Sequence, residues 1–224
     1  MSQVLAAAPD EISAAFDVAE AMARITQSDV HTMAASPADY PDADTFLAEL
    51  SRPDTVLGVL VPHPTHRADS WQVIQHSDKP VIVVPRHFVV HSSPAVSRVL
   101  VPLDGSKEAA LTVRDTMHLF ADAEVELVVL HVFDTTTVPK FWDQAAHARH
   151  GWEQQFRESC RIPATSTVEL RRGSPGQRIA EVAAEQHSDL IALGWSQNLA
   201  PGRARTVLST IRDADMPVML VPVT

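Results

Sequence analysis

Residues 76–85 read HSDKPVIVVP, and residues 213–222 read DADMPVMLVP. The two segments and the residues just before them share six identities at one offset, the 137 positions between His76 and Asp213. The identical pairs are Ile74 and Ile211, Asp78 and Asp215, Pro80 and Pro217, Val81 and Val218, Val84 and Val221, and Pro85 and Pro222. Each copy is a polar stretch, a proline, four apolar residues and a second proline. This pattern is typical of a buried strand that one proline precedes and another ends. The chain therefore contains the same strand twice.

A second repeat confirms that a larger unit is duplicated. VLAAAPDEISAAFDVAEAM at residues 4–22 aligns without a gap with VLVPLDGSKEAALTVRDTM at residues 99–117. With Val30 and Val125 just beyond, seven positions match: Val4, Leu5, Ala14, Ala15, Val18, Met22 and Val30 correspond to Val99, Leu100, Ala109, Ala110, Val113, Met117 and Val125. A strand and the helix after it recur together, so a self-similar unit determines the fold.

The second copy alternates short apolar strands with amphipathic helices. The predicted strands are 98–103, 125–133, 167–173, 189–194 and 218–223, and the predicted helices after the first four begin near 107, 138, 174 and 203. In the helix at 174, Ser174, Pro175 and Gln177 suit a capping box. The aromatic residues Phe141, Trp142, Trp152 and Phe156 favour a helix that packs on its own sheet over one that forms a partner surface. Alternation of this kind predicts βαβ units and a parallel sheet.

The first copy is shorter than the second. Between Ala35 and Asp44 it lacks the length for a third strand and the helix before it. We expect two domains, a degenerate one over residues 1–90 without a phosphate loop and a more complete one over residues 91–224.

Composition sets the class of protein. The chain has 224 residues, 45% of them hydrophobic and 21% charged, which is ordinary for a soluble globular protein. A net charge of −10 argues against nucleic acid or an anionic membrane as a partner. Cys160 is the single cysteine, which excludes an internal disulfide, and the first residues carry no basic region. We expect a cytoplasmic protein without a signal peptide.

Four separated blocks in the second copy resemble the universal stress protein family in its tandem form. They are VLVPLDGS, VVLHVFD, RRGSPGQRIAEVAAEQHSDLIALG and DADMPVMLVP. The resemblance covers residues 98–223 and, more weakly, residues 3–86. It implies an α/β fold of two tandem adenine-nucleotide alpha-hydrolase-like domains, each an open, mainly parallel sheet flanked by helices, related by a pseudo-twofold axis. It also implies that strands 81–84 and 218–221 pair antiparallel, whereas the alternative is that each is only an interior strand.

The resemblance directs attention to a nucleotide site in the second copy. Nucleotide-binding members carry Gly, two residues, Gly, nine residues, then Gly and Ser or Thr, because glycines let backbone N–H groups approach phosphate. Gly194 fits the first position, the second falls on Gln197, and no Gly-Ser pair follows. We expect the Cβ of Gln197 to restrict its backbone to negative φ and to fill phosphate space.

The remaining candidate residues are assigned to the same crevice. Asp104 matches the family position near adenine and ribose, and the alternative is that it only caps a helix. The predicted binding residues are Pro102, Leu103, Asp104, Val132 and Gly194, with Gly202, Arg203, Arg205 and Thr206 as partial replacements for the lost glycines. The expected cofactor is ATP or another adenine nucleotide, bound weakly.

The first copy is expected to bind no nucleotide. Gly58 is its one glycine before residue 105, VPHPTHRADSW at residues 61–71 replaces the phosphate loop, and Pro9 aligns with Asp104. A phosphate cradle cannot be built from these residues.

No residue group predicts catalysis. GWSQN at 194–198 resembles a nucleophile elbow around Ser196, but Asn198 replaces its last glycine, and we assign no hydrolase. HPTH at 63–66 and HARH at 147–150 lack a third metal ligand, and we assign neither a metal site nor a redox role for Cys160. We expect a stress-response regulatory or binding protein, with a ligand-free dimerisation or interaction scaffold as the alternative and an enzyme of the wider hydrolase group as a distant one. A homodimer is compatible with either expectation.

Overall fold

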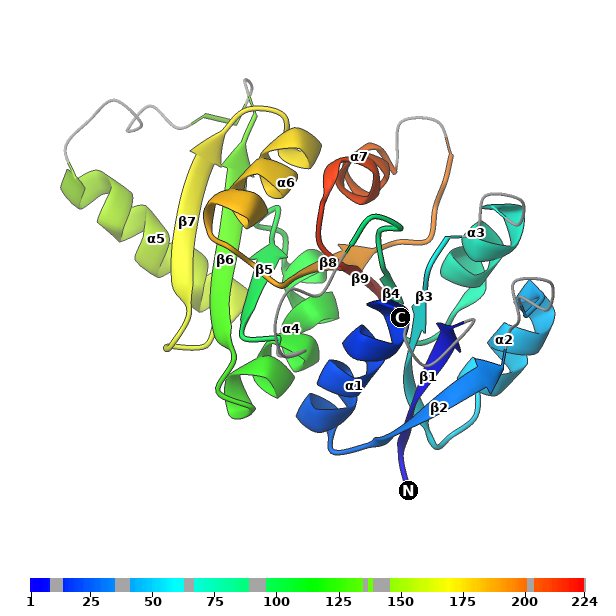
Figure 1. The fold of residues 1–224 in the computed structure, drawn as a ribbon. Coiled ribbons are helices and arrows are strands. Elements are labelled where there is room, and N and C mark those ends of the chain that lie inside the picture. The colour runs from blue at the N-terminus through cyan, green and yellow to red at the C-terminus, as the bar shows by residue number, and fades with distance from the viewer. Residues whose placement is uncertain are drawn as a thin grey trace.

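The computed structural model describes residues 1–8, 14–34, 41–62, 67–88, 96–134, 137–138, 146–200 and 204–223. These residues form one nine-stranded sheet in the order β2-β1-β3-β4-β9-β8-β5-β6-β7 (Figure 1). Its strands are β1 (Gln3–Ala8), β2 (Asp29–Ala34), β3 (Thr55–Leu60), β4 (Val81–Val83), β5 (Arg98–Pro102), β6 (Glu126–Phe133), β7 (Thr167–Arg172), β8 (Leu190–Trp195) and β9 (Val218–Pro222). Its helices are α1 (Ala14–Thr26), α2 (Ala43–Leu50), α3 (Arg67–His76), α4 (Lys107–Asp122), α5 (Ala146–Cys160), α6 (Pro175–Glu185) and α7 (Arg205–Asp213).

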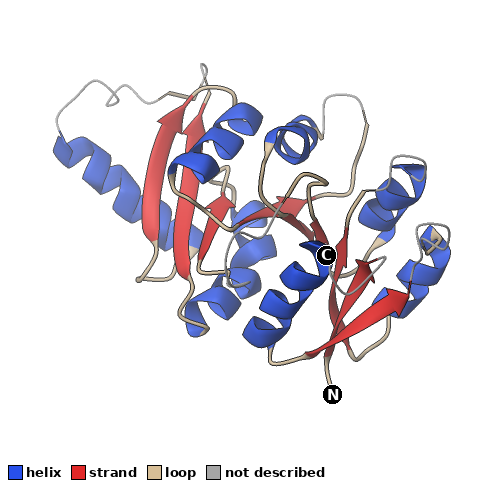
Figure 2. Ribbon diagram, viewed as in Figure 1, coloured by secondary structure: helices blue, strands red, loops and turns tan. Residues whose placement is uncertain are grey.

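Helices cover both faces of the sheet (Figure 2). Val99 and Val101 of β5 pack in the cluster that includes α1, α4 and α5, whereas Leu100 packs in the cluster that includes α2, α3, α6 and α7. All three side chains are fully buried, which explains why the strand sequences read as continuous apolar runs. None of the described helices has the combined length and apolar character needed to cross a bilayer.

The two halves have the same topology apart from one strand. The second half runs β7-β6-β5-β8-β9, all parallel, as predicted. The first half runs β2-β1-β3-β4, also parallel, and its described residues contain no counterpart of β7. The strand expected to be missing from the first copy is therefore the outermost one.

The repeated segments quoted at the outset meet at the centre of the sheet. β4 and β9 pair antiparallel, with Val81 opposite Leu220, Ile82 opposite Met219 and Val83 opposite Val218. Ile82 and Met219 are equivalent in the repeat, so each faces its own counterpart. The pseudo-twofold axis passes between them, and the prediction of an antiparallel junction is confirmed.

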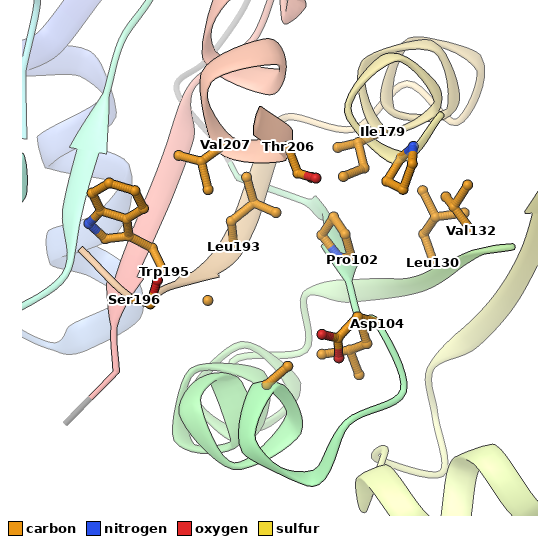
Figure 3. A pocket seen from close by; sticks show the side chains of 14 residues that line it. Pro102, Asp104, Leu130, Val132, Ile179, Leu193, Trp195, Ser196, Thr206 and Val207 are labelled. Atoms are coloured by element: carbon orange, nitrogen blue, oxygen red, sulfur yellow. The ribbon is translucent and has the colours of Figure 1, made fainter. Parts of the chain in front are cut away.

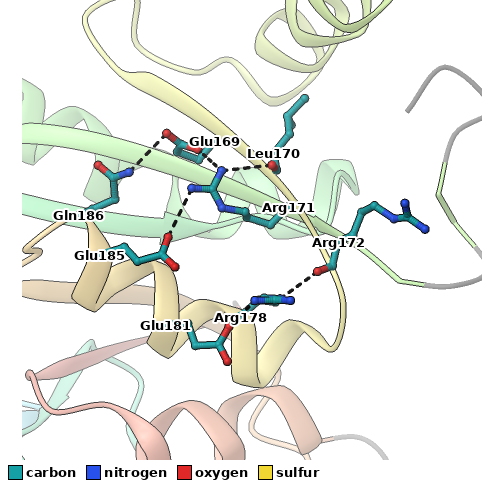
Figure 4. A network of polar contacts seen from close by, with 8 residues as sticks. All are labelled: Glu169, Leu170, Arg171, Arg172, Arg178, Glu181, Glu185 and Gln186. Carbon is teal, nitrogen blue, oxygen red and sulfur yellow. Dashed lines mark hydrogen bonds and ion pairs between the residues drawn. The ribbon is translucent and has the colours of Figure 1, made fainter. Parts of the chain in front are cut away.

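Charged side chains lie along the outer strand of the second half. Arg171 of β7 pairs with Glu169 at 2.5 Å and with Glu185 of α6 at 3.5 Å. Arg178 of α6 donates to the carbonyl oxygen of Arg172 at 2.9 Å (Figure 4). Charges on an exposed edge strand discourage pairing with other chains.

The start of α6 differs from the predicted capping box. Ser174 is the N-cap residue and Pro175 follows it, but the Ser174 side chain makes no capping hydrogen bond. Gln177 instead donates from Nε2 to Oε1 of Glu181, one turn further along. The prediction was wrong because a partner inside the helix satisfies Gln177.

The aromatic residues of α5 pack on the protein's own sheet, as predicted. Trp152 and Phe156 stack with ring centres 4.9 Å apart, and both contact His131 of β6. Phe141 and Trp142 lie outside the described residues.

Candidate functional site

A cavity opens in the second half where two strands diverge. β5 and β8 pair at Val99–Leu190 and Leu100–Ile191, after which both strands continue without further pairing to each other. The cavity that begins there has a volume of about 290 Å³ and lies at the carboxyl ends of β5, β6 and β8 (Figure 3). Because the chain order reverses between β5 and β8, this is the switch point at which open parallel sheets bind ligands.

Six of the nine predicted site residues line this one cavity. They are Pro102, Leu103, Asp104, Val132, Gly194 and Thr206. Arg205 is the exposed first residue of α7 and does not line the cavity. Gly202 and Arg203 lie outside the described residues.

The turn after β5 presents the Asp104 carboxylate to the cavity. Its Oδ1 accepts a hydrogen bond from the Ser106 backbone N–H at 2.8 Å. Gly105 between them has φ of +86°, a conformation that suits glycine. The N-cap of α4 is Ser106, whose Oγ accepts from the Ala109 N–H at 3.1 Å. Asp104 thus braces the turn without being the helix cap.

The side chain of His131 holds the residue before this turn by a hydrogen bond. Its Nδ1 lies 2.8 Å from the Leu103 carbonyl oxygen, which can only accept, so Nδ1 carries a proton. Burial lowers the pKa of His131, while the hydrogen bond to Leu103 and the nearby charge of Asp104 act in the opposite direction. The neutral ring therefore holds the end of β5 in place.

The backbone conformation of Gln197 differs from the prediction made from its residue type. Its φ is +56°, the left-handed conformation that a glycine would supply at this position. Its side chain is not among those that line the cavity but reaches the residue after α3 in the first half, where Nε2 donates to the Ser77 carbonyl oxygen at 2.5 Å. The expectation of a negative φ was wrong, whereas the expectation that Gln197 fills phosphate space stays a prediction. Hydrogen bonds from another part of the chain hold the strained backbone.

Two helices begin at the cavity without a side-chain cap. The N-cap of α7 is Ala204, and no side chain caps its first turn. Thr206 and Val207 of that turn line the cavity, as does Pro175 at the start of α6. Uncapped N-terminal N–H groups and the helix dipole favour an anion.

Sequence reasoning missed eight lining residues. They are Ala109, Leu130, Pro175, Ile179, Leu193, Trp195, Ser196 and Val207. Pro175 and Ser196 follow the ends of β7 and β8, and carboxyl ends of parallel strands share one edge, so topology was a signal for both. The inward apolar side chains of α6 and α7 could not be assigned to the cavity from sequence, because their pattern is the same as that of ordinary core residues.

The other clusters considered in the sequence form no site among the described residues. No three histidine, cysteine, aspartate or glutamate side chains gather there as a metal site would require, and residues 63–66 lie outside the description. Cys160 is 2% exposed, and burial raises the pKa of its thiol, which disfavours the reactive thiolate.

Solved structures share this fold across nearly the whole chain. A functionally unknown protein of Pseudomonas aeruginosa PAO1 superimposes with a TM-score of 0.66 at 15% identity, covering 99% of this chain and 92% of its own. A universal stress protein from Archaeoglobus fulgidus gives a TM-score of 0.56 at 17% identity, covering 99% and 86%. Identities this low establish the fold. No protein with a curated description matches the chain.

The sequence itself identifies the family. The model of the universal stress protein family matches residues 95–222, more than half of the chain and all the strands around the cavity. The resemblance read from the four sequence blocks is thereby confirmed, and the chain belongs to the universal stress protein family.

Proposed function

We propose that this chain is a cytoplasmic stress-response binding protein whose second half binds an adenine nucleotide weakly, and whose first half binds none. The observation that carries the proposal is the cavity at the switch point, with a carboxylate on one side and uncapped helix N-termini on the other. A regulatory role fits better than a metabolic one. A serine hydroxyl such as Ser196 is a weak nucleophile unless a base activates it, and no histidine is among the described lining residues.

The chemistry of the lining suits the parts of a nucleotide. Pro102, Leu130 and Val132 offer apolar contacts to a planar base, and the Asp104 carboxylate accepts hydrogen bonds from ribose hydroxyls or an amino group. On the opposite side, the Thr206 hydroxyl and the α7 N-terminus suit phosphate (Figure 3).

The size of the cavity and its loop both support weak binding. Its volume of about 290 Å³ is at the lower end for a small-molecule site, so base and ribose would fill it and phosphates would lie at the rim. The Gly-Ser pair of the family motif is absent from the loop, so the backbone cradle for phosphate is reduced. We expect affinity in the micromolar to millimolar range, about −8 to −4 kcal/mol.

Fluorescence titration tests the proposal, because Trp195 lines the cavity. ATP, ADP, cyclic AMP and adenosine are added separately, and the emission of the four tryptophans is followed. Asp104→Asn should weaken binding about 10- to 100-fold, since it removes hydrogen bonds to a charged acceptor. Asp122→Asn, which removes an exposed carboxylate at the other end of α4, is the matched control and should change nothing.

The same experiment separates the proposal from the ligand-free scaffold. If millimolar nucleotide leaves the emission unchanged, and mass spectrometry of the denatured purified protein finds no released nucleotide, the scaffold is the better description. A signal that survives Asp104→Asn would place the site elsewhere.

A further inference from the structure

The positive φ of Gln197 has a different cause from that of the other non-glycine residues with positive φ. Among the described residues, five that are not glycine have positive φ: Gln27, Glu124, Arg161, His187 and Gln197. The first four directly follow the C-terminal turns of α1, α4, α5 and α6. In each, the next residue's N–H bonds to a carbonyl five residues back, as in Ser28 to Ala23 and Ser188 to Ala183. Helix termination accounts for these four. Gln197 ends no helix and needs another cause.

That cause lies in the first half of the protein. Nε2 of Gln197 donates to the carbonyl oxygens of Ser77 at 2.5 Å and Ile74 at 3.5 Å. Nε1 of Trp195 donates to the same Ile74 oxygen at 3.2 Å. Trp195 and Ser77 are each 3% exposed, so the indole bond is shielded from water, and the two Gln197 bonds are half-buried.

The acceptors are carbonyls that a helix end leaves unsatisfied. Ile74 lies in the last turn of α3, and Ser77 follows that helix. The last carbonyls of a helix have no partner within it. The side chains of Trp195, the last residue of β8, and of Gln197, two residues further on, therefore act as the C-terminal cap of α3, across the β4–β9 junction.

The end of β8 and the residue after it form a wall of the cavity. Gly194, Trp195 and Ser196 line it, and Gln197 is the next residue. The Trp195 indole extends toward the first half, away from Asp104 (Figure 3). Gly194, Trp195 and Ser196 of this four-residue segment thus border the cavity, while the side chains of Trp195 and Gln197 donate to carbonyl oxygens at the end of α3.

We propose that residues 194–197 form a latch through which the first half positions this wall of the cavity in the second half. Gln197 and Trp195 are its positioning residues, and the C-terminal turn of α3 is its anchor. The latch gives the first half, which we expect to bind no nucleotide, a role in positioning the cavity of the second half. A ligand that shifts Trp195 or Ser196 must loosen or tighten the bonds to Ile74 and Ser77. The coupling to ligand rests on the proposed function, whereas the latch itself does not.

Hydrogen exchange of the ligand-free protein tests the latch. Gln197→Glu keeps the side-chain size but turns a carboxylate toward carbonyl oxygens, and Gln197→Gly keeps the backbone conformation while removing the side chain. Backbone amides of residues 73–79, followed by mass spectrometry, should exchange about five- to tenfold faster in both variants. His187→Gly makes the same replacement at a residue of similar positive φ after α6 and should leave the amides of residues 73–79 unaffected. Unchanged exchange at 73–79 in both Gln197 variants would overturn the latch.

A second arm adds ATP at saturation and tests the coupling. In the parent protein, ATP should change exchange at residues 73–79 about fivefold or more, and Gln197→Glu should remove that change while still binding ATP. If ATP binds and these amides do not respond, the coupling is overturned and the proposed function stands. If ATP does not bind, the proposed function fails, and the ligand-free arm alone decides the latch.

Discussion

His131 makes the stability of the second half depend on pH. The neutral ring donates to the Leu103 carbonyl oxygen and is surrounded by Phe133, Trp152 and Phe156. Because burial lowers its pKa when folded, the unfolded chain binds a proton more readily. The stability from the neutral ring is complete above the ordinary pKa of about 6.5 and is lost as pH falls below it toward the lowered folded value.

His131→Asn should flatten this dependence. Asn keeps an N–H donor but does not titrate, so the fall in the free energy of unfolding between about pH 7.5 and about pH 5.5 should be smaller than in the parent protein. Urea unfolding at each pH measures it. His118→Asn, on the exposed face of α4, should keep the parental slope. An identical slope in His131→Asn would show that the ring does not stay neutral.

The backbone conformation of a single residue is hard to predict from the sequence when distant contacts determine it. Gln197 was expected at negative φ because a Cβ disfavours the left-handed region. The bonds that hold it at +56° come from Ile74 and Ser77, more than a hundred residues away, and no local pattern includes them. Gly105 shows the opposite case. Its φ of +86° follows from a local strand-to-helix turn, which the letters DGS do predict.

At the scale of elements, α6 and α7 pack unusually closely. A Cβ on Gly176 of α6 would lie 2.6 Å from the Ser209 Cβ and 2.8 Å from its Oγ on α7. Both helices border the cavity, so this spacing also sets where their N-termini lie.

Gly176→Ala should therefore be destabilising, although alanine favours a helix. Separating the two helices costs about 1–3 kcal/mol, which equals or exceeds the helix-propensity gain of about 1 kcal/mol. Gly151→Ala on α5 meets nothing within 4 Å and should stabilise by about 0.5–1 kcal/mol. Urea unfolding of both variants measures the difference. Stabilisation by both substitutions would mean that α6 and α7 are not held at this spacing.

Elements whose signal is local were predicted well. The strands of the second half begin and end within a few residues of the predicted bounds, and α4 begins where it was predicted, because apolar periodicity and buried faces coincide. The capping box of α6 failed because Glu181 competes for Gln177, a choice between two equally local partners. Site residues on the strand ends were predictable from the topology. The inward residues of α6 were not, because their sequence pattern is the same as that of ordinary core residues.

At the scale of the whole molecule, duplication made the junction predictable. The repeat fixed which strands are equivalent, and the register brings Ile82 opposite its own counterpart Met219. The latch was not predictable in this way, because Trp195 and Gln197 break the repeat symmetry that identified everything else at the junction.

The same symmetry predicts how the second half behaves alone. A chain of residues 91–224, the proposed second domain, has no β4, so the edge of β9 and its buried apolar row become exposed. Exposed apolar edges pair with available strands. Because the axis passes between Ile82 and Met219, a second β9 can take the place of β4 with Met219 opposite Met219.

Light scattering of this chain should accordingly give twice the monomer mass. A peptide of residues 78–86 supplies the missing strand by augmentation and should convert the dimer to a one-to-one complex, whereas a scrambled peptide should not. A folded monomer without peptide would show that the exposed edge does not drive association. An unfolded chain would contradict the domain boundary near residue 90, since the first half would then be needed to complete the core of the second.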